Sequence, residues 1–501
     1  MKRDLAGLSM VAAIALMAAP LAAETPQRDV IAAKVDQQHE ATIKALRDWI
    51  ALPTIAAEKR GTPEGAEYMR QLALDAGFQQ AKIIPTDGVP AVFATLDQGA
   101  PTTLGIYFMY DVKQFDPAEW NAPPLEGRLV ERPGEGVSMV GRGVVNQKGP
   151  QMAFLAAIKA IHASGRKLPV NIVLVAEGEE EVASTHFDQV IAVPEVQAAL
   201  AKTMGVFIPA ANQNRDGSAE ITLGAKGAVE FQLVVGGETS DKYPKTDVHS
   251  SNHARIESPA WRLVKALDTL VADDGHTPAI DGWFENVQPL TARQKELIAQ
   301  AANPEREKQE KALLGVGKWI GDEDYQTSLE RFYSQPTVNI QGLVAGYTGE
   351  GGKTVLPGRA EAKLEFRLVP KMTKAEAVSK LKAHLAKRGF DDVQVTVSGG
   401  YGPNETAEDS VLIRAQKRMF EEKGIAYTIR PRNAGSWPGV VFNGAPLNLP
   451  ASQFGLGRGG GAHAPNEWFL IESSDPKVYG LDEATMAYVD YLYVLAEEAA
   501  R

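Results

Sequence analysis

The sequence predicts an α/β protein in which a ferredoxin-like α+β module interrupts an α/β domain. Strand and helix patterns alternate through the first half of the chain, as in an α/β layer. From Ala228 the pattern changes to two successive βαβ units, and after Gly399 a helical pattern returns. We therefore expect residues 24–224 and 399–501 to form one domain, with residues 225–398 inserted into it.

The elements of the first part follow from apolar periodicity. We expect helices over 41–52, 62–77 and 150–162, and strands over 89–96, 103–108, 171–176 and 204–208. Pro150 stands at the first position of the third helix, where its missing N–H is not needed.

The inserted module and the last part are assigned in the same way. We expect strands over 229–235, 337–343, 362–368 and 392–398, and helices over 259–271 and 374–388. The charge-rich segment 291–314 predicts a solvated helix. The last part should contain a helix over 410–423, short strands, and a final helix from Asp482.

The N-terminus has the pattern of an export signal. Lys2 and Arg3 precede an apolar, Ala-rich stretch that ends at Ala22 and Ala23, which predicts a signal peptide over residues 1–23. A retained anchor is the alternative, although the stretch is short for a membrane span. In either case the body of the protein is expected outside the cytoplasm, periplasmic or secreted, with no membrane contact after cleavage.

Composition excludes several function classes. The formal net charge of -11 disfavours a nucleic-acid partner, because a phosphate backbone would be repelled. The chain has no cysteine, which excludes disulfides, thiolate metal sites and a cysteine nucleophile. Hydrophobic residues make up 44% of the chain, enough for a sizeable core.

Polar motifs stand at the ends of the predicted strands. The run 177–181 (EGEEE) follows strand 171–176, where open α/β sheets place their ligand sites. One carboxylate there can bind a cation while its neighbour deprotonates water, although such a run alone is more often a solvated loop. Asp111 ends another strand, the run 141–150 (GRGVVNQKGP) leads into a helix, and His463 follows three glycines.

Together these motifs resemble the dinuclear zinc metallopeptidase family that includes carnosinase, succinyl-diaminopimelate desuccinylase, aminoacylase and carboxypeptidase G. The similarity covers nearly the whole mature chain and is greatest to the carnosinase-like dipeptidases; residues 120–127 and 336–370 support it. The resemblance implies a zinc-exopeptidase-like α/β catalytic domain interrupted by a ferredoxin-like lid and dimerisation domain. It also implies a homodimer.

The metal ligands that the resemblance implies are incomplete. Where the family has a histidine, a bridging aspartate and a later aspartate, this chain has Met109, Asn146, and Ala210 or Ala211. The second site keeps only Glu181 and His463, with the neutral amide of Asn146 beside them. Thioether and amide groups are poor zinc ligands, so we expect at most one zinc ion, or none. Rescue by His186, His249 or His253 is the less favoured alternative.

The family's catalytic and substrate-binding positions are largely kept. The resemblance assigns Glu180 as general base, places Asp111 beside it, and assigns His249 to polarise the scissile carbonyl across a dimer interface. Thr354, Arg367 and Ser436 match residues that grip a substrate carboxylate, for which the planar fork of arginine is well suited. Read from the residues alone, Arg367 could instead pair with Glu365 or Glu361 on its own sheet, and Ser436 could be an ordinary turn residue.

The function expected is that of an exported dipeptidase or amidohydrolase. Its substrate would be a small amide with a free carboxylate, such as a dipeptide or an N-acyl amino acid. Two alternatives stay open: an inactive binding protein that keeps the cleft, and a metal-independent enzyme that uses Glu180 as base.

Overall fold

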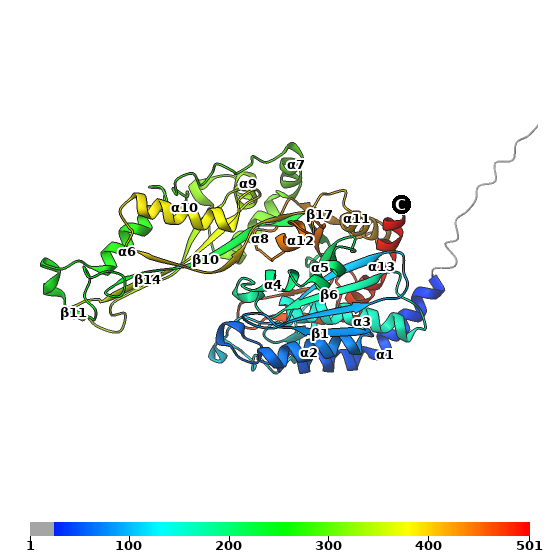
Figure 1. The fold of residues 1–501 in the computed structure, drawn as a ribbon. Helices are drawn as coiled ribbons and strands as arrows, with labels where there is room; N and C mark the ends of the chain where they lie inside the picture. Colours follow the sequence, from blue (N-terminus) through cyan, green and yellow to red (C-terminus); the bar gives the residue numbers. More distant parts are fainter. Residues whose placement is uncertain (1–24) are drawn as a thin grey trace, which may run out of the picture.

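The computed structural model describes residues 25–501, which form two bodies joined side by side, a catalytic domain and an elongated lid (Figure 1). The predicted signal peptide, residues 1–23, lies outside the described residues. Within residues 25–501, no helix is both long and apolar enough to cross a membrane.

A six-stranded sheet forms the centre of the catalytic domain, in the order β1-β2-β6-β3-β7-β18. The strands are β1 (Gln80–Ile84), β2 (Ala91–Leu96), β3 (Thr103–Met109), β6 (Asn171–Glu177), β7 (Val206–Pro209) and β18 (Ala451–Phe454). β3 runs parallel to β6 and β7, so the chain leaves β3 and β6 at the same edge. Both strands are apolar almost throughout and buried, as expected for parallel strands covered on two faces.

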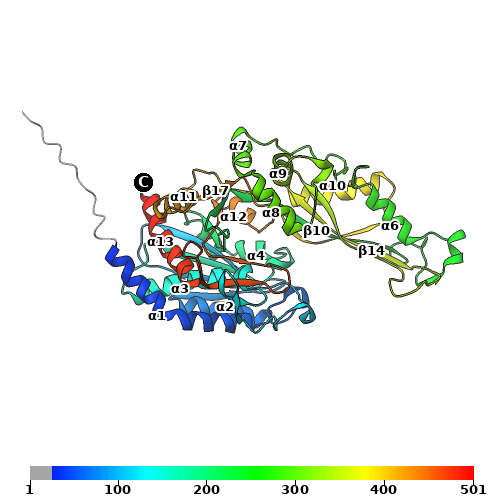
Figure 2. The same ribbon diagram turned by 180° about the vertical axis from the view of Figure 1, so that it is seen from behind.

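Helices cover both faces of this sheet (Figures 1 and 2). One face packs against the larger group: α1 (Thr25–Ile50), α2 (Thr62–Asp75), α3 (Gly149–Ala163), α11 (Val411–Lys423) and α13 (Leu481–Ala500). The other face packs against α4 (Phe187–Ile191), α5 (Pro194–Leu200) and α12 (Val440–Asn443). Aromatic residues dominate the contact on each side, with Phe154 among Phe108, Phe207 and Tyr488 on the first.

A second sheet of four strands, β19-β20-β5-β4, completes the catalytic domain. It comprises β4 (Arg128–Arg132), β5 (Gly136–Val140), β19 (Gly459–Gly460) and β20 (Trp468–Ser473). This sheet joins segments more than 300 residues apart in sequence, and it brings the loop of His463 next to the loop that follows β5.

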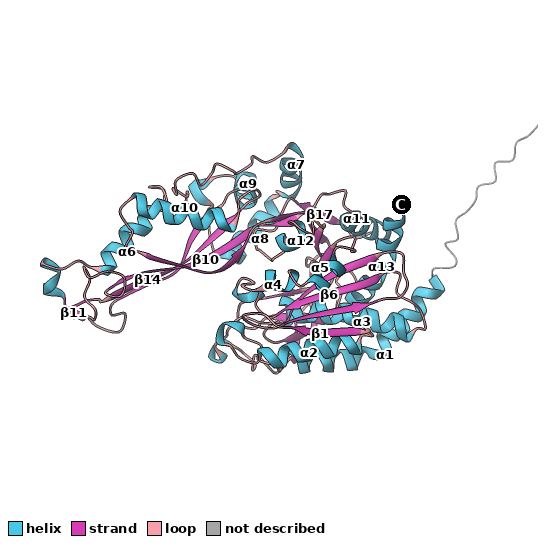
Figure 3. Cartoon of the chain, viewed as in Figure 1, coloured by secondary structure: helices cyan, strands magenta, loops and turns pink. Residues whose placement is uncertain are grey.

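The lid is a four-stranded antiparallel sheet, β12-β14-β10-β15, with helices on one face (Figure 3). Its strands are β10 (Gly227–Gly236), β12 (Thr337–Ala345), β14 (Arg359–Leu368) and β15 (Gln394–Tyr401), and its core helices are α6 (Pro259–Asp268) and α10 (Lys374–Lys387). β12 is one of its two edge strands, and β15 is the other. The predicted architecture, an α/β domain interrupted by a ferredoxin-like α+β lid, is confirmed.

The charge-rich segment 291–314 differs from the prediction of a solvated helix. It forms two helices, α7 (Ala292–Ala301) and α8 (Pro304–Leu314), and only α8 is without buried residues. Leu297 of α7 belongs to the hydrophobic core of the catalytic domain, and Ile298 packs against α9 (Tyr325–Ser334). The charges occupy the outer face of α7, so composition alone did not reveal the buried face.

Short elements connect these parts. They are β8 (Ala219–Thr222), β9 (Gly224–Ala225), β11 (Val248–His249), β13 (Val355–Leu356), β16 (Asn404–Glu405), β17 (Tyr427–Arg430), and the helical turns η1 (Ala56–Glu58), η2 (Pro117–Glu119), η3 (Val144–Lys148), η4 (Glu180–Val182), η5 (Ser250–Ala254) and η6 (Ile320–Asp322).

Candidate active site

The turn η4, which carries Glu180 and Glu181, is held over the end of β3 by Asp111. One carboxylate oxygen of Asp111 accepts the backbone N–H of Glu180 at 3.2 Å and the other accepts that of Glu181 at 3.0 Å. Burial, and the nearby charge of Glu181, raise the pKa of Asp111 to about 8. Asp111 therefore acts as a positioning residue that fixes the acidic turn.

Gly178 allows the acidic run to approach the sheet closely. A Cβ atom at this position would lie 2.4 Å from the ring of Tyr110, which is fully buried. The chain can therefore turn from β6 into η4 only because residue 178 has no side chain.

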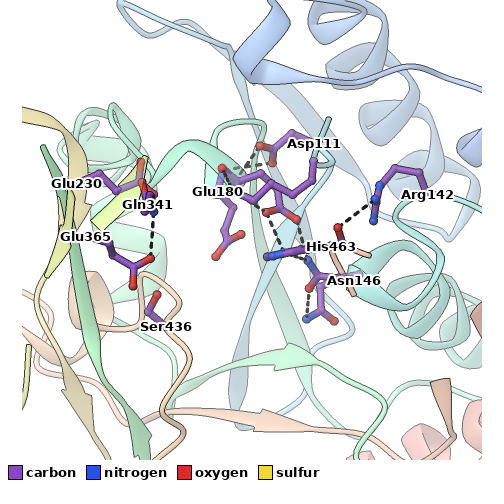
Figure 4. Close-up of polar contacts among 12 residues, drawn as sticks. Asp111, Arg142, Asn146, Glu180, Glu230, Gln341, Glu365, Ser436 and His463 are labelled. Carbon is purple, nitrogen blue, oxygen red and sulfur yellow. Dashed lines mark hydrogen bonds and ion pairs between the residues drawn. The ribbon is translucent and has the colours of Figure 1, made fainter. Parts of the chain in front are cut away.

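The two glutamates of η4 contact different parts of the site; Glu180 is labelled in Figure 4. Glu181 is directed to the loops that carry Asn146 and His463, and its side chain is 4% exposed. Glu180 is half-buried, and its carboxylate lies 3.5 Å from the hydroxyl of Tyr401. Desolvation, together with the charges of Glu181 and Asp111, raises the pKa of Glu180 well above its ordinary value. A raised pKa brings a carboxylate closer to what a general base requires near neutral pH.

Nitrogen groups surround the carboxylate of Glu181. Asn146 Nδ2 donates to Oε1 at 2.7 Å, and His463 Nε2 lies 3.1 Å from Oε2. Lys113 Nζ lies 3.4 Å from Oε2 and also donates to the backbone carbonyl of Glu181. Asn146 and His463 are themselves in contact, with 3.0 Å between Nδ2 and Nε2.

Glu467 fixes the conformation of the loop that carries Asn146. Its fully buried carboxylate accepts the backbone N–H groups of Gly143, Val145 and Asn146 at 2.8 to 2.9 Å. Arg142 donates to the same carboxylate at 2.8 Å and to the backbone carbonyl of His463. This buried pair therefore sets the positions of Asn146 and His463, two of the three side chains that contact Glu181.

These groups do not fit a pair of zinc ions. Within residues 25–501, no set of three or more His, Asp or Glu side chains is arranged to hold a metal ion. Met109 ends β3 as a buried residue opposite Glu177, and Ala210 follows β7. An amide N–H and an ammonium group have no lone pair to offer a cation, whereas zinc sites use carboxylate, imidazole or thiolate groups.

His186, one of the histidines considered as an additional metal ligand, contacts Glu179. Its Nδ1 lies 2.8 Å from Glu179 Oε2, and the other oxygen of that carboxylate accepts the backbone N–H of Val89.

Tyr401 connects Glu180 with the predicted carboxylate-binding residues. Its hydroxyl lies 3.3 Å from Ser436 Oγ, and Ser436 Oγ accepts a hydrogen bond from Arg367 Nη1 at 2.9 Å. Arg367 also pairs with Glu365 through Nε at 2.6 Å and Nη2 at 3.1 Å. Arg367 is therefore paired with Glu365 on its own sheet, as one interpretation of the sequence allowed, and it also directs Nη1 to Ser436, while its role in binding a substrate carboxylate stays a prediction.

A cavity of about 230 Å³ separates η4 from the lid sheet. Lys113 and Glu181 line it on the catalytic side, and Glu230, Gln341 and Lys363 line it on the lid side. Gln341 lies 3.4 Å from both Glu230 and Glu365, so the lid wall is polar (Figure 4). A small polar molecule held here would contact both domains.

His249 and Thr354 do not join this group within one chain. His249 lies in β11, paired with β13 at the end of the lid farthest from the catalytic domain (Figure 1). The carbonyl of Thr354 accepts the N–H of Ser250, so both residues belong to the same exposed tip. His249 Nδ1 is 2.8 Å from Ser251 Oγ.

The sequence analysis predicted no role for three residues of the site, Glu467, Lys113 and Tyr401. Glu467 had a visible signal, since it is a carboxylate in the same short loop as His463. Lys113 follows Asp111 by two positions, but only the folding of η4 over β3 reveals its contact with Glu181. Tyr401 comes from the last strand of the lid sheet, and nothing in the sequence relates it to Glu180.

Comparison with known proteins identifies the family of this chain. The model of peptidase family M20/M25/M40 matches residues 110–485. The chain belongs to this family. The Cys-Gly metallodipeptidase DUG1 of Saccharomyces cerevisiae is 25% identical over 468 residues, which cover 87% of this chain and 92% of that protein. Human Beta-Ala-His dipeptidase is 25% identical over 370 residues, or 70% of each chain.

A solved structure supports the M20 assignment. The M20 family metallo-carboxypeptidase Sso-CP2 from Sulfolobus solfataricus superposes with a TM-score of 0.80 at 30% identity, over 91% of this chain and 99% of that one. The predicted family is thereby confirmed, and its relatives are peptidases.

Proposed function

We propose that this M20 protein is an exported dipeptidase or amidohydrolase that uses Glu180 as general base on a small amide with a free carboxylate. The observation that carries the proposal is the continuous polar path from Glu180 through Tyr401 and Ser436 to Arg367, with steps of 3.5, 3.3 and 2.9 Å. A base and an arginine joined in this way can serve the two ends of one small substrate.

The substrate class follows from the relatives and from the cleft. Relatives bear the names Cys-Gly metallodipeptidase and Beta-Ala-His dipeptidase, which supports a dipeptide or an N-acyl amino acid. Arg367 Nη1 is the arginine atom directed to Ser436, so a substrate carboxylate would be held by that N–H group and the serine hydroxyl. The metal content that goes with this proposal is at most one divalent ion, on Glu181 and His463 with Asn146.

We also propose a homodimer whose partner completes the site. The edge strand β12 exposes Ile340, Leu343 and Val344, with Val344 61% exposed. An apolar, unpaired edge strand is normally covered in a native protein. Pairing two lids along this edge would account for His249 and Thr354 lying far from Glu180 of their own chain, since they would then serve the partner.

Turnover by the wild type and by Glu180→Gln on a panel of dipeptides and N-acyl amino acids tests the proposed activity. Glu179→Gln is the matched control, because this neighbouring carboxylate contacts His186 and the backbone N–H of Val89. Loss of turnover in Glu180→Gln alone supports the hydrolase. Equal background turnover in wild type and Glu180→Gln would leave the binding-protein alternative.

Export and assembly need separate measurements. N-terminal sequencing of the protein recovered from the periplasm or medium should begin near Glu24. Sedimentation should give a dimer for the wild type and a monomer for Val344→Asp.

A further inference from the structure

Lys113 holds Glu181 at two points. Its ammonium group lies 3.4 Å from Oε2 of the side chain and donates to the backbone carbonyl of the same residue. The Lys113 side chain is 30% exposed, on the wall of the cavity, whereas the Glu181 side chain is 4% exposed. The lysine therefore brings a positive charge from the cavity wall directly onto a buried carboxylate.

The other contacts of the Glu181 carboxylate are also to nitrogen atoms. Oε1 accepts the amide of Asn146 at 2.7 Å, and Oε2 lies 3.1 Å from His463 Nε2 as well as near Lys113. A buried carboxylate requires a compensating charge and hydrogen-bond donors, and here one ammonium, one amide and one imidazole provide both. A divalent ion at the same oxygens would meet the ammonium group at close range, and like charges there repel.

Among the described residues, Glu181 is the carboxylate within ion-pair distance of Lys113, whose charge acts on Glu180 only at longer range. Asp111 is occupied by the backbone N–H groups of η4, and Glu180 is directed to Tyr401. Lys363 lines the opposite wall of the cavity on the lid. Lys113 is thus the lysine whose ammonium group contacts Glu181.

We infer that Lys113 is a built-in cation that takes the place of a divalent metal ion at Glu181. The donor set around this carboxylate disagrees with the zinc chemistry of the family, and the lysine accounts for the disagreement. The negative charge of Glu181 is then balanced by the ammonium group of Lys113 without a metal ion. This inference goes beyond the proposed function, because the charge balance at Glu181 does not depend on whether the cleft hydrolyses its ligand.

Calorimetric titration of zinc into the metal-stripped full chain tests the inference. The wild type is expected to show no saturable site at micromolar zinc, and Lys113→Met is expected to bind zinc at least tenfold more tightly. Lys363→Met is the matched control, since it removes a lysine from the same cavity without touching Glu181; its titration should match that of the wild type. Zinc bound by Lys113→Met must disappear in Lys113→Met/Glu181→Ala, which excludes sites elsewhere on the surface.

Melting temperature gives a second readout that needs no substrate. In EDTA, Lys113→Met should melt below the wild type, and zinc should raise its melting temperature while leaving that of the wild type unchanged. Lys113→Gln, which keeps a donor but removes the charge, replaces Lys113→Met if the latter does not fold.

Two results would overturn the inference. The first is tight stoichiometric zinc binding by the wild type that depends on Glu181. The second is a lysine-free variant that binds zinc no better than the wild type. Neither result reports on turnover, so a failure here is distinguishable from a failure of the Glu180 experiment.

Discussion

Replacing Asn146 by aspartate would introduce the carboxylate that the family resemblance predicts at this position, and the structure gives the cost of doing so. Asn146 Nδ2 lies 2.7 Å from Oε1 of the buried Glu181. In Asn146→Asp an oxygen takes the place of that donor, so two carboxylates face each other with charge centres about 4 Å apart. At an effective dielectric constant near 20 their repulsion is about 4 kcal/mol, and the lost hydrogen bond adds about 1 kcal/mol or more.

The expected result is a large loss of stability in the absence of metal. In EDTA, Asn146→Asp should lower the free energy of unfolding by about 5 kcal/mol, or less where a proton is shared between the two carboxylates. Asn146→Ala is the control, because it removes the donor without adding charge, and should cost about 1 to 3 kcal/mol.

Zinc should recover part of this loss, because the new carboxylate joins Glu181 and His463 as a third ligand. At a concentration 100 times the dissociation constant, binding stabilises the folded state by about 2.7 kcal/mol. The recovery should be greater when Lys113→Met is added. Differential scanning fluorimetry in EDTA and in zinc measures all of these changes. An Asn146→Asp protein as stable in EDTA as the wild type would show that the carboxylates at positions 146 and 181 do not repel each other in the folded protein.

Three further predictions concern the surroundings of the site. Arg142→Met leaves the carboxylate of Glu467 buried and unpaired, so urea unfolding should show a loss of about 3 to 5 kcal/mol. Burial lowers the pKa of Lys226 to about 7, so the unfolded state binds more protons between pH 7 and 10, and the wild type gains up to about 1.4 kcal/mol per pH unit there from this group. Lys226→Met should therefore be stabilising at pH 6, with an advantage that shrinks as pH rises; an advantage that does not change with pH would contradict this sign. Gly178→Ala places a methyl group 2.4 Å from the ring of Tyr110, so a melting temperature unchanged from the wild type would contradict the close packing seen there.

The sequence predicted β2, β3, β6 and β7 of the central sheet because these strands are apolar runs, whereas β1 was missed because it is mostly exposed. The prediction of 103–108 and 171–176 differs from β3 and β6 by one residue at one end of each. The second sheet was missed, since β4 is mostly exposed and polar and β19 is a pair of glycines. Neither strand shows an alternating apolar pattern, and only their pairing with β5 and β20 defines them.

The site was predictable in part, for a related reason. The positions of Asp111, Glu181 and His463 follow from strand ends and glycine-rich loops, which leave local signals in the sequence. The contacts of Lys113 and Tyr401 depend on how η4 and β15 pack, because the N–H of Gly400 binds the carbonyl of Ala183 and so places Tyr401 beside Glu180. Such contacts arise from tertiary packing and leave no local pattern.

The most direct test of the account is an anomalous difference map, recorded at the zinc edge, from crystals of the wild type soaked in zinc. If Lys113 takes the place of a metal ion, the map should show no peak beside Glu181, and the electron density should show the Lys113 ammonium group in contact with that carboxylate. One or two peaks beside Glu181, between the loops of Asn146 and His463, would contradict this prediction.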